Sequence, residues 1–336
     1  MIISKRPRLT VLLIGVLLLT ALNLLVGAWT HRLFYYKKLE EIRTARNPSL
    51  LFLGNSLLDT TVDNAALVEA ARNPRLKPLN AALGGTLPPE HRLLCEYALR
   101  TQPNIRTIVV GFYDFQITEP DNTRVSDLVG NRMVGIDQRF PIAEVASAYA
   151  FGPLDDLEIQ GLRLLPIVAN RGNAVAYFEM MRRSRYVERL RRSMESMSML
   201  HVDPNTILDA DGLPVIESAD FDSFDASARA FIDHPDRFNP SYEAIFDKAR
   251  DAGVNAVLLV MPVSPFHRAA YYSRSSWRDY LAALERLAAR RNIRVIDASD
   301  WQPLPADFED HLHMNRPGGH RFSMLLGSEL SREGYQ

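Results

Sequence analysis

The sequence predicts an α/β protein: a three-layer α/β/α sandwich with a central, mainly parallel sheet, an N-terminal transmembrane helix and a largely helical insertion. Three observations lead to this fold class. Short apolar runs alternate with helical stretches, which favours parallel strands joined by right-handed crossovers. Residues 10–29 form an uncharged apolar stretch long enough to cross a bilayer. Residues 115–238 interrupt the alternation and are too long for a loop in a compact domain.

The apolar stretch near the N-terminus, TVLLIGVLLLTALNLLVGAW, contains eight leucines and no charge. As a helix it would span about 30 Å, the thickness of the hydrocarbon core of a bilayer. We expect residues 1–30 to be an uncleaved transmembrane signal-anchor and residues 31–48 a juxtamembrane linker. The alternative is a cleavable signal peptide, because basic residues precede the stretch and Val26-Gly27-Ala28 resembles a cleavage site. Cleavage near Ala28 would give a secreted protein.

Residues 49–336 predict one α/β domain with five strands. Leu50–Leu53 is a short apolar run, typical of a buried strand, and residues 106–111 are apolar and β-branched enough to be central. The other predicted strands are residues 79–83, 255–263 and 293–297. The predicted helices are residues 63–71, with Asp63 as N-cap, 88–100, 240–252, 276–291 and a last one after Pro317.

The predicted insertion, residues 115–238, lies between the third and fourth strands and would form a lid or a polymer groove. It contains a helical patch near residues 173–199. Six arginines crowd this patch: Arg182, Arg183, Arg185, Arg189, Arg191 and Arg192. We expect a solvated helix face, and the alternative is a docking surface for anionic lipid headgroups or an acidic polysaccharide. No nucleic-acid partner is expected, because no series of aromatic side chains alternates with the arginines.

Candidate chemistry stands at the end of the first strand and near the C-terminus. Gly54-Asn55-Ser56 places a hydroxyl where the chain leaves the strand, the usual location of a site in an open α/β sheet. A serine hydroxyl needs a base to become a nucleophile, and a histidine oriented by an aspartate supplies one. Asp310 and His313 are close enough in sequence for one turn to bring them together. The alternative is that Ser56 is a turn residue or cap and that Asp310 and His313 are a surface pair.

Four sequence blocks in the expected order resemble the SGNH (GDSL-type) hydrolase superfamily. Gly54-Asn55-Ser56 is similar to its nucleophile block, with Asn in place of Asp, and residues 80–85 to the block whose glycine helps to bind the oxyanion. Residues 111–114 stand where the family carries Gly-x-Asn-Asp, and residues 310–318 match its closing Asp and His block. The resemblance covers roughly residues 50–115 and 240–330. Looser variants of these blocks resemble the membrane-anchored branch that O-acylates cell-envelope polysaccharides and teichoic acids.

The resemblance implies a Ser56–Asp310–His313 triad and an oxyanion hole formed by the backbone N–H groups of Ser56 and Gly85. Tyr113 and Asp114 occupy the position of the family's oxyanion Asn, so a third donor is not assigned. The implied function is a serine esterase or O-acyltransferase acting, through an acyl-enzyme, on a small ester or on an exported carbohydrate polymer. The implied O-acyl group is acetyl. A non-catalytic scaffold subunit and a lipid or thioester hydrolase are the alternatives.

The same resemblance places the protein in the inner (cytoplasmic) membrane as a single-pass protein, with its large domain in the periplasm or outside. A membrane-bound acyl-transfer protein is then an expected partner. The Lys and Arg residues on the two sides of the apolar stretch do not decide the orientation.

Composition adds exclusions rather than a function. The net charge of −1 names no partner, and a single cysteine, Cys95, excludes an internal disulfide framework and cysteine-based zinc sites. No nucleotide-binding glycine motif is present, and we expect no cofactor. Histidines and aspartates between residues 307 and 320 raise a metal site as an alternative, but their spacing matches no His-Glu-x-x-His pattern, and we expect no metal.

Overall fold

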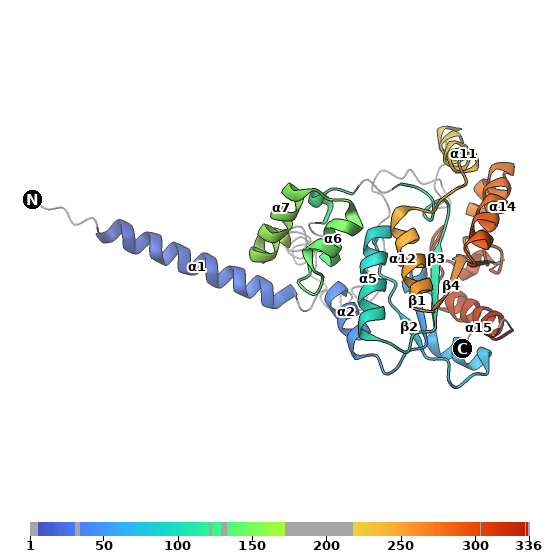
Figure 1. The fold of residues 1–336 in the computed structure, drawn as a ribbon, viewed down its shortest axis with the longest axis horizontal. Coiled ribbons are helices and arrows are strands. Elements are labelled where there is room, and N and C mark those ends of the chain that lie inside the picture. Colours follow the sequence, from blue (N-terminus) through green and yellow to red (C-terminus); the bar gives the residue numbers. More distant parts are fainter. Residues whose placement is uncertain are drawn as a thin grey trace, which may run out of the picture. The chain divides into compact units, whose positions relative to one another are not determined.

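The computed structural model describes residues 6–30, 34–120, 123–128, 133–171, 218–302, 304–332 and 334. The arginine-rich stretch 182–192 and the helical patch predicted for residues 173–199 lie outside these ranges. The chain divides into two compact units, each traced in Figure 1. One comprises residues 1–38 and 123–196, and the other, called here the α/β unit, comprises residues 39–122 and 197–336.

The centre of the α/β unit is a five-stranded sheet in the order β2-β1-β3-β4-β5, in which all four pairings are parallel. Its strands are β1 (Leu50–Leu53), β2 (Pro78–Asn80), β3 (Thr107–Phe112), β4 (Asn255–Val260) and β5 (Arg294–Asp297). The predicted α/β class and parallel sheet are therefore confirmed.

Two strands end earlier than the sequence predicts. The Asn80 side chain accepts a hydrogen bond from Ala82 N, which turns the chain away at the end of β2. β4 ends two residues before Pro262, which has no N–H to contribute to the ladder.

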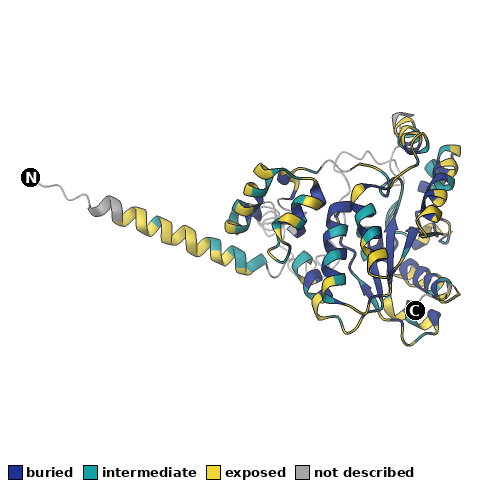
Figure 2. Cartoon of the chain, viewed as in Figure 1, coloured by how far each residue is buried: buried dark blue, intermediate teal, exposed yellow. Residues whose placement is uncertain are grey.

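Helices cover both faces of the sheet (Figure 1). α5 (Pro88–Thr101) and α12 (Pro240–Asp251) lie on one side, and α14 (Ser275–Arg290) and α15 (Arg316–Arg332) lie on the other. Every residue of β1 and β3 is buried, which is why both strands are apolar runs rather than alternating patterns. Figure 2 shows this buried layer through the middle of the unit. The three-layer sandwich follows from two apolar sheet faces that each need a cover.

One side of the core contains α4 (Asn64–Ala71) packed against α15. Gly327 permits the close approach, because a Cβ added there would lie 2.2 Å from the Leu67 carbonyl oxygen. α15 in turn places its N-terminus beside the segment that contains Asp310 and His313. The packing of α15 therefore positions that segment.

The remaining helices of the α/β unit complete its edges. α2 (Phe34–Thr44), in the range predicted as linker, buries Leu39 and Ile42, and Gln102 Nε2 donates to the Ile42 carbonyl at 2.7 Å. α3 (Ser56–Asp59) follows β1, and a short α13 (Pro265–His267) with a π-turn (Arg268–Tyr272) follows β4. α11 (Ser218–Ile232), from the end of the predicted insertion, packs against α14.

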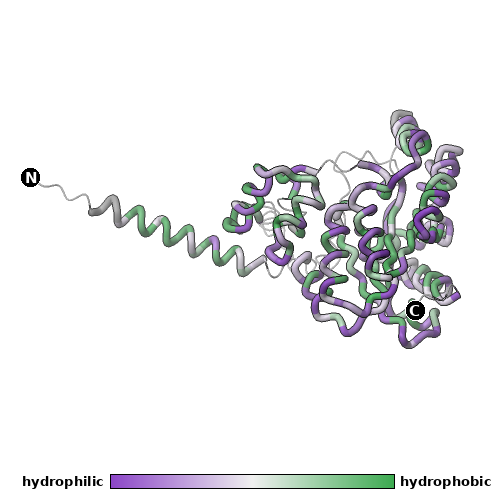
Figure 3. The backbone as a smooth tube through the Cα atoms, in the orientation of Figure 1, coloured by the Kyte–Doolittle hydropathy of each residue, from purple (hydrophilic) through white to green (hydrophobic). Residues whose placement is uncertain are grey.

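The other unit combines the N-terminal helix with part of the insertion. α1 (Arg6–Thr30) includes the apolar segment Thr10–Thr30, which is long and apolar enough to cross a membrane and fits a single-pass anchor or a signal sequence. Figure 3 colours most of this helix as hydrophobic (green). The insertion contributes α6 (Ile142–Tyr149), α7 (Pro153–Leu164), α8 (Pro166–Ala169) and 3-10 turns at Val125–Leu128 and Met133–Ile136. Its described residues are thus largely helical, as predicted.

Candidate active site

The candidate site lies at the carboxyl end of β1, at the β1/β3 switch point of the strand order β2-β1-β3-β4-β5. Such a switch point leaves a crevice between neighbouring strand ends. Gly54 directly follows β1 and lies close to Gly111 of β3. A side chain would not fit there, because a Cβ on Gly54 would lie 2.8 Å from the Gly111 carbonyl oxygen. Asn55 then caps α3, its Oδ1 accepting from Leu57 N at 3.0 Å. Its amide Nδ2 donates to Gln116 Oε1 at 3.3 Å. Asn55 therefore serves as a turn and cap residue that holds Ser56 at the first helical position.

The structure brings Ser56, His313 and Asp310 into one hydrogen-bonded chain. His313 Nε2 lies 2.9 Å from Ser56 Oγ, and His313 Nδ1 lies 2.8 Å from Asp310 Oδ2. With Nδ1–H donating to the carboxylate, Nε2 is left as the acceptor for the Ser56 hydroxyl proton. The geometry is that of a nucleophile, a base and a group that orients the base.

Asp310 is held in place by its own backbone turn. Its Oδ1 accepts from Leu312 N and from His313 N, both at 2.7 Å, so the loop rather than a helix brings the two side chains together. Burial raises the pKa of this carboxyl, but the hydrogen bonds from the His313 ring and from the two backbone N–H groups outweigh it and lower the pKa to about 2. Asp310 is therefore ionised at any physiological pH, as a group that orients an imidazole must be.

Two backbone N–H groups, those of Ser56 and Gly85, are candidate hydrogen-bond donors at the site. Among the described residues, no hydrogen bond engages the N–H of Ser56 or of Gly85. Gly85 has φ of +73°, a left-handed conformation that favours glycine, and Thr86 Oγ1 ties the same turn to the Leu83 carbonyl. The glycine turn can therefore present its N–H without a side chain in the way.

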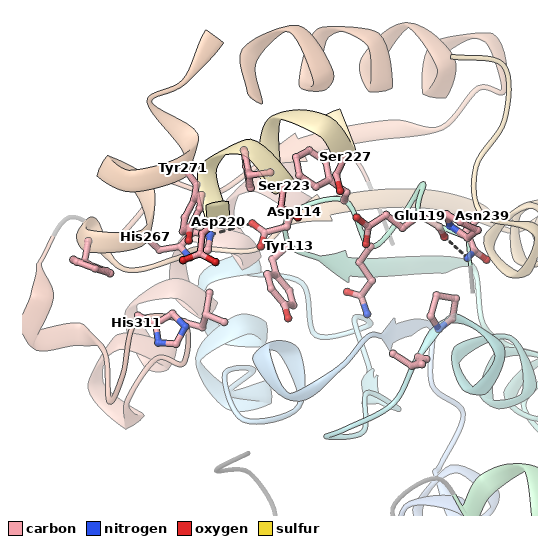
Figure 4. Close-up of a pocket in the computed structure, with 18 residues that line it drawn as sticks. Tyr113, Asp114, Glu119, Asp220, Ser223, Ser227, Asn239, His267, Tyr271 and His311 are labelled. Carbon is pink, nitrogen blue, oxygen red and sulfur yellow. Dashed lines mark hydrogen bonds and ion pairs between the residues drawn. The ribbon is translucent and has the colours of Figure 1, made fainter. Parts of the chain in front are cut away.

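Tyr113 directly follows β3, at the position where the sequence resemblance places the family's oxyanion Asn. Its ring packs against the core cluster that includes Leu57 and Leu58, and within the described residues nothing hydrogen-bonds its hydroxyl. Burial, then the nearby carboxylates of Asp114 and Glu119, raise the pKa of the phenol to about 12. The group is thus a neutral O–H donor at neutral pH. The phenol points away from Asp114 in Figure 4.

A second aspartate–histidine pair lies beside the first, and the sequence patterns did not indicate it. Asp114 has φ of +48°, its Oδ1 lies 3.0 Å from His267 Nε2, and its N–H donates to Tyr272 Oη at 3.0 Å. The His267 ring is stacked on that of His311 at 6.3 Å between centroids. His267 follows β4 as Asp114 follows β3, so the position of both after parallel strands was the available signal. The contacts of Asp114 with His267 and Tyr272 fix the loop that follows Tyr113.

Tyr113, Asp114, His267 and His311 line a cavity of about 600 Å³ (Figure 4), which lies beside the Ser56–His313–Asp310 chain rather than around it. Carboxylates of Asp114, Glu119 and Asp220 face it, together with the Asn239 and Gln116 amides. Aromatic and apolar walls come from α11 and from the segment after β4. Of the residues described, none that lines the cavity is Lys or Arg. The cavity is thus acidic, partly aromatic and adjacent to His313 through His311 and Leu312.

His91 is a buried histidine that supports the glycine turn at Gly85 and Thr86. The sequence patterns did not indicate this role. His91 Nε2 lies 3.0 Å from Thr86 Oγ1 and its Nδ1 lies 2.9 Å from Tyr242 Oη. Burial lowers the pKa of this imidazole to about 3, so it remains neutral and joins the glycine turn to α12. A lone histidine on a predicted helix gives no sequence signal for such a role.

The histidines and aspartates that suggested a metal site in the sequence pair with different side chains and do not form one cluster. His320 Nδ1 lies 3.0 Å from Asp63 Oδ2, and Asp307 pairs with Arg321. Within the part of the chain that the structure describes, no three His, Cys, Asp or Glu residues are grouped closely enough to share a metal ion.

Comparison with known proteins gives likeness in structure only. No protein-family model and no curated protein matches the chain. A proposed acylhydrolase from Bacteroides fragilis aligns at 8% identity and a TM-score of 0.41, over 89% of this chain and 96% of that one. A lipase/acylhydrolase from Enterococcus faecalis aligns at 10% identity and a TM-score of 0.35, over 85% and 96%. A GDSL-like lipase from Bacteroides thetaiotaomicron aligns at 8% identity and a TM-score of 0.39, over 89% and 98%.

Proposed function

We propose that the chain is an SGNH-type serine hydrolase or O-acyltransferase that cleaves an ester through an acyl-enzyme on Ser56. The single observation that supports this most is the Ser56–His313–Asp310 chain, with both hydrogen bonds at 2.8–2.9 Å. Ser56 and His313 are 257 positions apart in the sequence, and with Asp310 they meet in the order and geometry that nucleophilic catalysis needs.

In the first half of the reaction, His313 Nε2 takes the Ser56 hydroxyl proton as Ser56 Oγ attacks the ester carbonyl carbon. Asp310 holds the imidazole in the tautomer that can accept this proton, and it stabilises the imidazolium that forms. His313 then returns the proton to the departing alkoxide as the carbon–oxygen bond breaks, which leaves the acyl group on Ser56.

The negative charge on the carbonyl oxygen needs donors placed before the reaction. We assign this role to the N–H groups of Ser56 and Gly85 and to the Tyr113 hydroxyl, which takes the place of the family's asparagine. Each such donor is typically worth about 10²–10³ in turnover. In the second half, His313 deprotonates either water, giving an esterase, or a sugar hydroxyl, giving a transferase. The oxygen so activated attacks the acyl carbon, the bond to Ser56 Oγ breaks, and His313 returns the proton to Ser56 Oγ.

The substrate class follows from the cavity and from α1. Carboxylates, amides and aromatic rings suit the hydroxyls and faces of sugar rings, and a lining that is acidic and free of Lys and Arg among the described residues favours a neutral chain over an anionic one. With α1 as an uncleaved anchor in the inner membrane and the α/β unit exported, the acceptor is a cell-envelope or exported carbohydrate and the acyl group is acetyl. A membrane-bound acyl donor protein is then the expected partner, and no nucleic acid takes part.

A fluorophosphonate probe tests the nucleophile directly. The purified full-length chain should gain one probe adduct, located on Ser56 by mass spectrometry, and release acetate from p-nitrophenyl acetate. Ser56→Ala and His313→Ala should each abolish both signals, and the double variant should lose little more, because the residues act as one unit. Ser223→Ala, in the neighbouring cavity, is the matched control and should label normally. Normal labelling of Ser56→Ala would refute the assignment.

A second candidate is a non-catalytic SGNH-like scaffold subunit of a polysaccharide acylation assembly. Tyr113 at the oxyanion position is the observation that favours it, because a bulky ring there differs from the family's short amide. A folded full-length protein that neither labels nor hydrolyses any ester, yet binds the polymer, would support the scaffold. Preference for acyl-thioesters or lipids in the same assay would indicate a lipid or thioester hydrolase.

A further inference from the structure

An exposed apolar stripe runs along α7 and into α8. Leu154 and Leu157 in α7 are 81% and 63% exposed, and Leu164, at the end of the same helix, is 75% exposed. Their spacing of three and seven places them on one side of the helix, and Leu165 and Val168 extend the stripe. The other side of the helix is already used, because Ile159 and Leu162 are buried. Figure 2 shows the exposed residues along α7.

This stripe is fastened to the apolar helix α1. Asn23 is a polar residue inside the apolar segment, and its side-chain amide donates one hydrogen bond to the α7–α8 corner and accepts one from it. Its Nδ2 donates to the Leu164 carbonyl at 3.0 Å, and its Oδ1 accepts from Ile167 N at 3.1 Å. Gly27, one turn further on, lies against Pro166. A polar group at this depth is costly unless both its donor and its acceptor are satisfied, as they are here.

The contact fixes how deep the corner lies if α1 spans a bilayer. Asn23 precedes Thr30, the end of the apolar segment, by seven residues, which is about 10 Å along a helix. The polar interfacial layer on each side of a bilayer is only about 5–8 Å thick. The Leu164 carbonyl, held at the level of Asn23, therefore lies at or below the edge of the hydrocarbon.

We propose that the stripe on α7 and α8 is a lipid-binding surface, through which the insertion lies in the membrane interface beside the anchor. The inference rests on the proposed anchoring by α1. Lipid is the occupant because the stripe continues the apolar surface of α1 at the same depth, where acyl chains would surround both. Amphipathic helices bind interfaces in this way by burying one apolar face to a depth of about 5–10 Å.

The result for the protein is a fixed attachment rather than a flexible tether. A single span leaves the following domain free to rotate, whereas a second element in the interface adds a second point of contact. The unit that carries α6–α8 would then be oriented with respect to the bilayer surface.

Depth-dependent quenching in vesicles tests the proposal on the full-length chain. Cys95 is buried and would be replaced by Ala, and a single new cysteine would carry a nitrobenzoxadiazole fluorophore. Labels at Leu157→Cys and Leu164→Cys should lose at least half of their fluorescence in phosphatidylethanolamine–phosphatidylglycerol vesicles that contain lipid with a nitroxide near the headgroup. Glu285→Cys, exposed on α14, is the control and should not be quenched.

A label at Leu18→Cys, in the middle of the apolar segment, separates this proposal from the anchor on which it rests. If the Leu18 label is quenched by a nitroxide deep in the acyl chain while both α7 labels keep full intensity, the lipid surface is wrong and the anchor stands. That outcome would leave a protein partner as the occupant of the stripe. If the Leu18 label is not quenched either, the anchor itself is wrong, and the proposal falls with it.

Discussion

Replacing Tyr113 with phenylalanine removes one hydroxyl and tests whether this side chain completes the oxyanion site. The aromatic ring packs against the core cluster around Leu57 and Leu58, and phenylalanine keeps that packing. No hydrogen bond to the phenol is lost elsewhere, because none of the described residues makes one. The variant should therefore fold with an unchanged melting temperature and differ only in the donor.

The expected magnitude follows from the loss of one neutral donor to a developing oxyanion. A loss of about 2.7–4 kcal/mol of transition-state stabilisation corresponds to about a 10²- to 10³-fold fall in kcat, with KM little changed. The phenol pKa is raised to about 12, so the hydroxyl stays protonated and the fold-change should be constant between pH 6 and pH 10. A donor with an ordinary pKa would begin to fail at the upper end of that range.

Two rates measure the effect: hydrolysis of p-nitrophenyl acetate and the second-order rate of fluorophosphonate labelling. Both reactions place negative oxygen at the same position, so both should fall together. Tyr271→Phe, which removes a hydroxyl from the same cavity, is the matched control and should keep both rates. Equal rates for Tyr113→Phe and the unmodified chain would refute the assignment of Tyr113 and leave an oxyanion site of two backbone donors.

Two further predictions concern stability. The pKa of Asp310 is lowered in the folded state from 3.8 to about 2, so its ionised form contributes about 2 kcal/mol above pH 4, and this contribution is lost as the pH falls through 2. In urea unfolding, the stability difference between the unmodified chain and Asp310→Asn should shrink from pH 5 to pH 2, and a constant difference would contradict the shift. Gly327→Ala should lower stability by about 2 kcal/mol or more, because the added Cβ meets the Leu67 carbonyl oxygen, whereas Gly161→Ala, with nothing within 4 Å, should be neutral or slightly stabilising.

The sequence alone determined the parts of this protein that depend on local pattern. Apolar runs marked β1 and β3, because a strand buried on both faces must be apolar throughout. Asp63 and Pro88 marked two helix starts, because caps and first-turn prolines act within a few residues. The motif residues Ser56, Asp310 and His313 were selected by type and order, and the structure places them together.

Contacts between residues far apart in the sequence depend on how the strands and helices pack. The Asp114–His267 pair joins residues 153 positions apart, and His91 reaches Tyr242 across 151. Neither pair has a local pattern, because each side chain is positioned by the strand or helix that carries it, and those elements meet only when the sheet is assembled. The same holds for Asn23, which in the sequence is only a polar residue within an apolar helix. Its side-chain amide donates a hydrogen bond to the carbonyl of Leu164, 141 residues away, and this contact forms only in the folded chain.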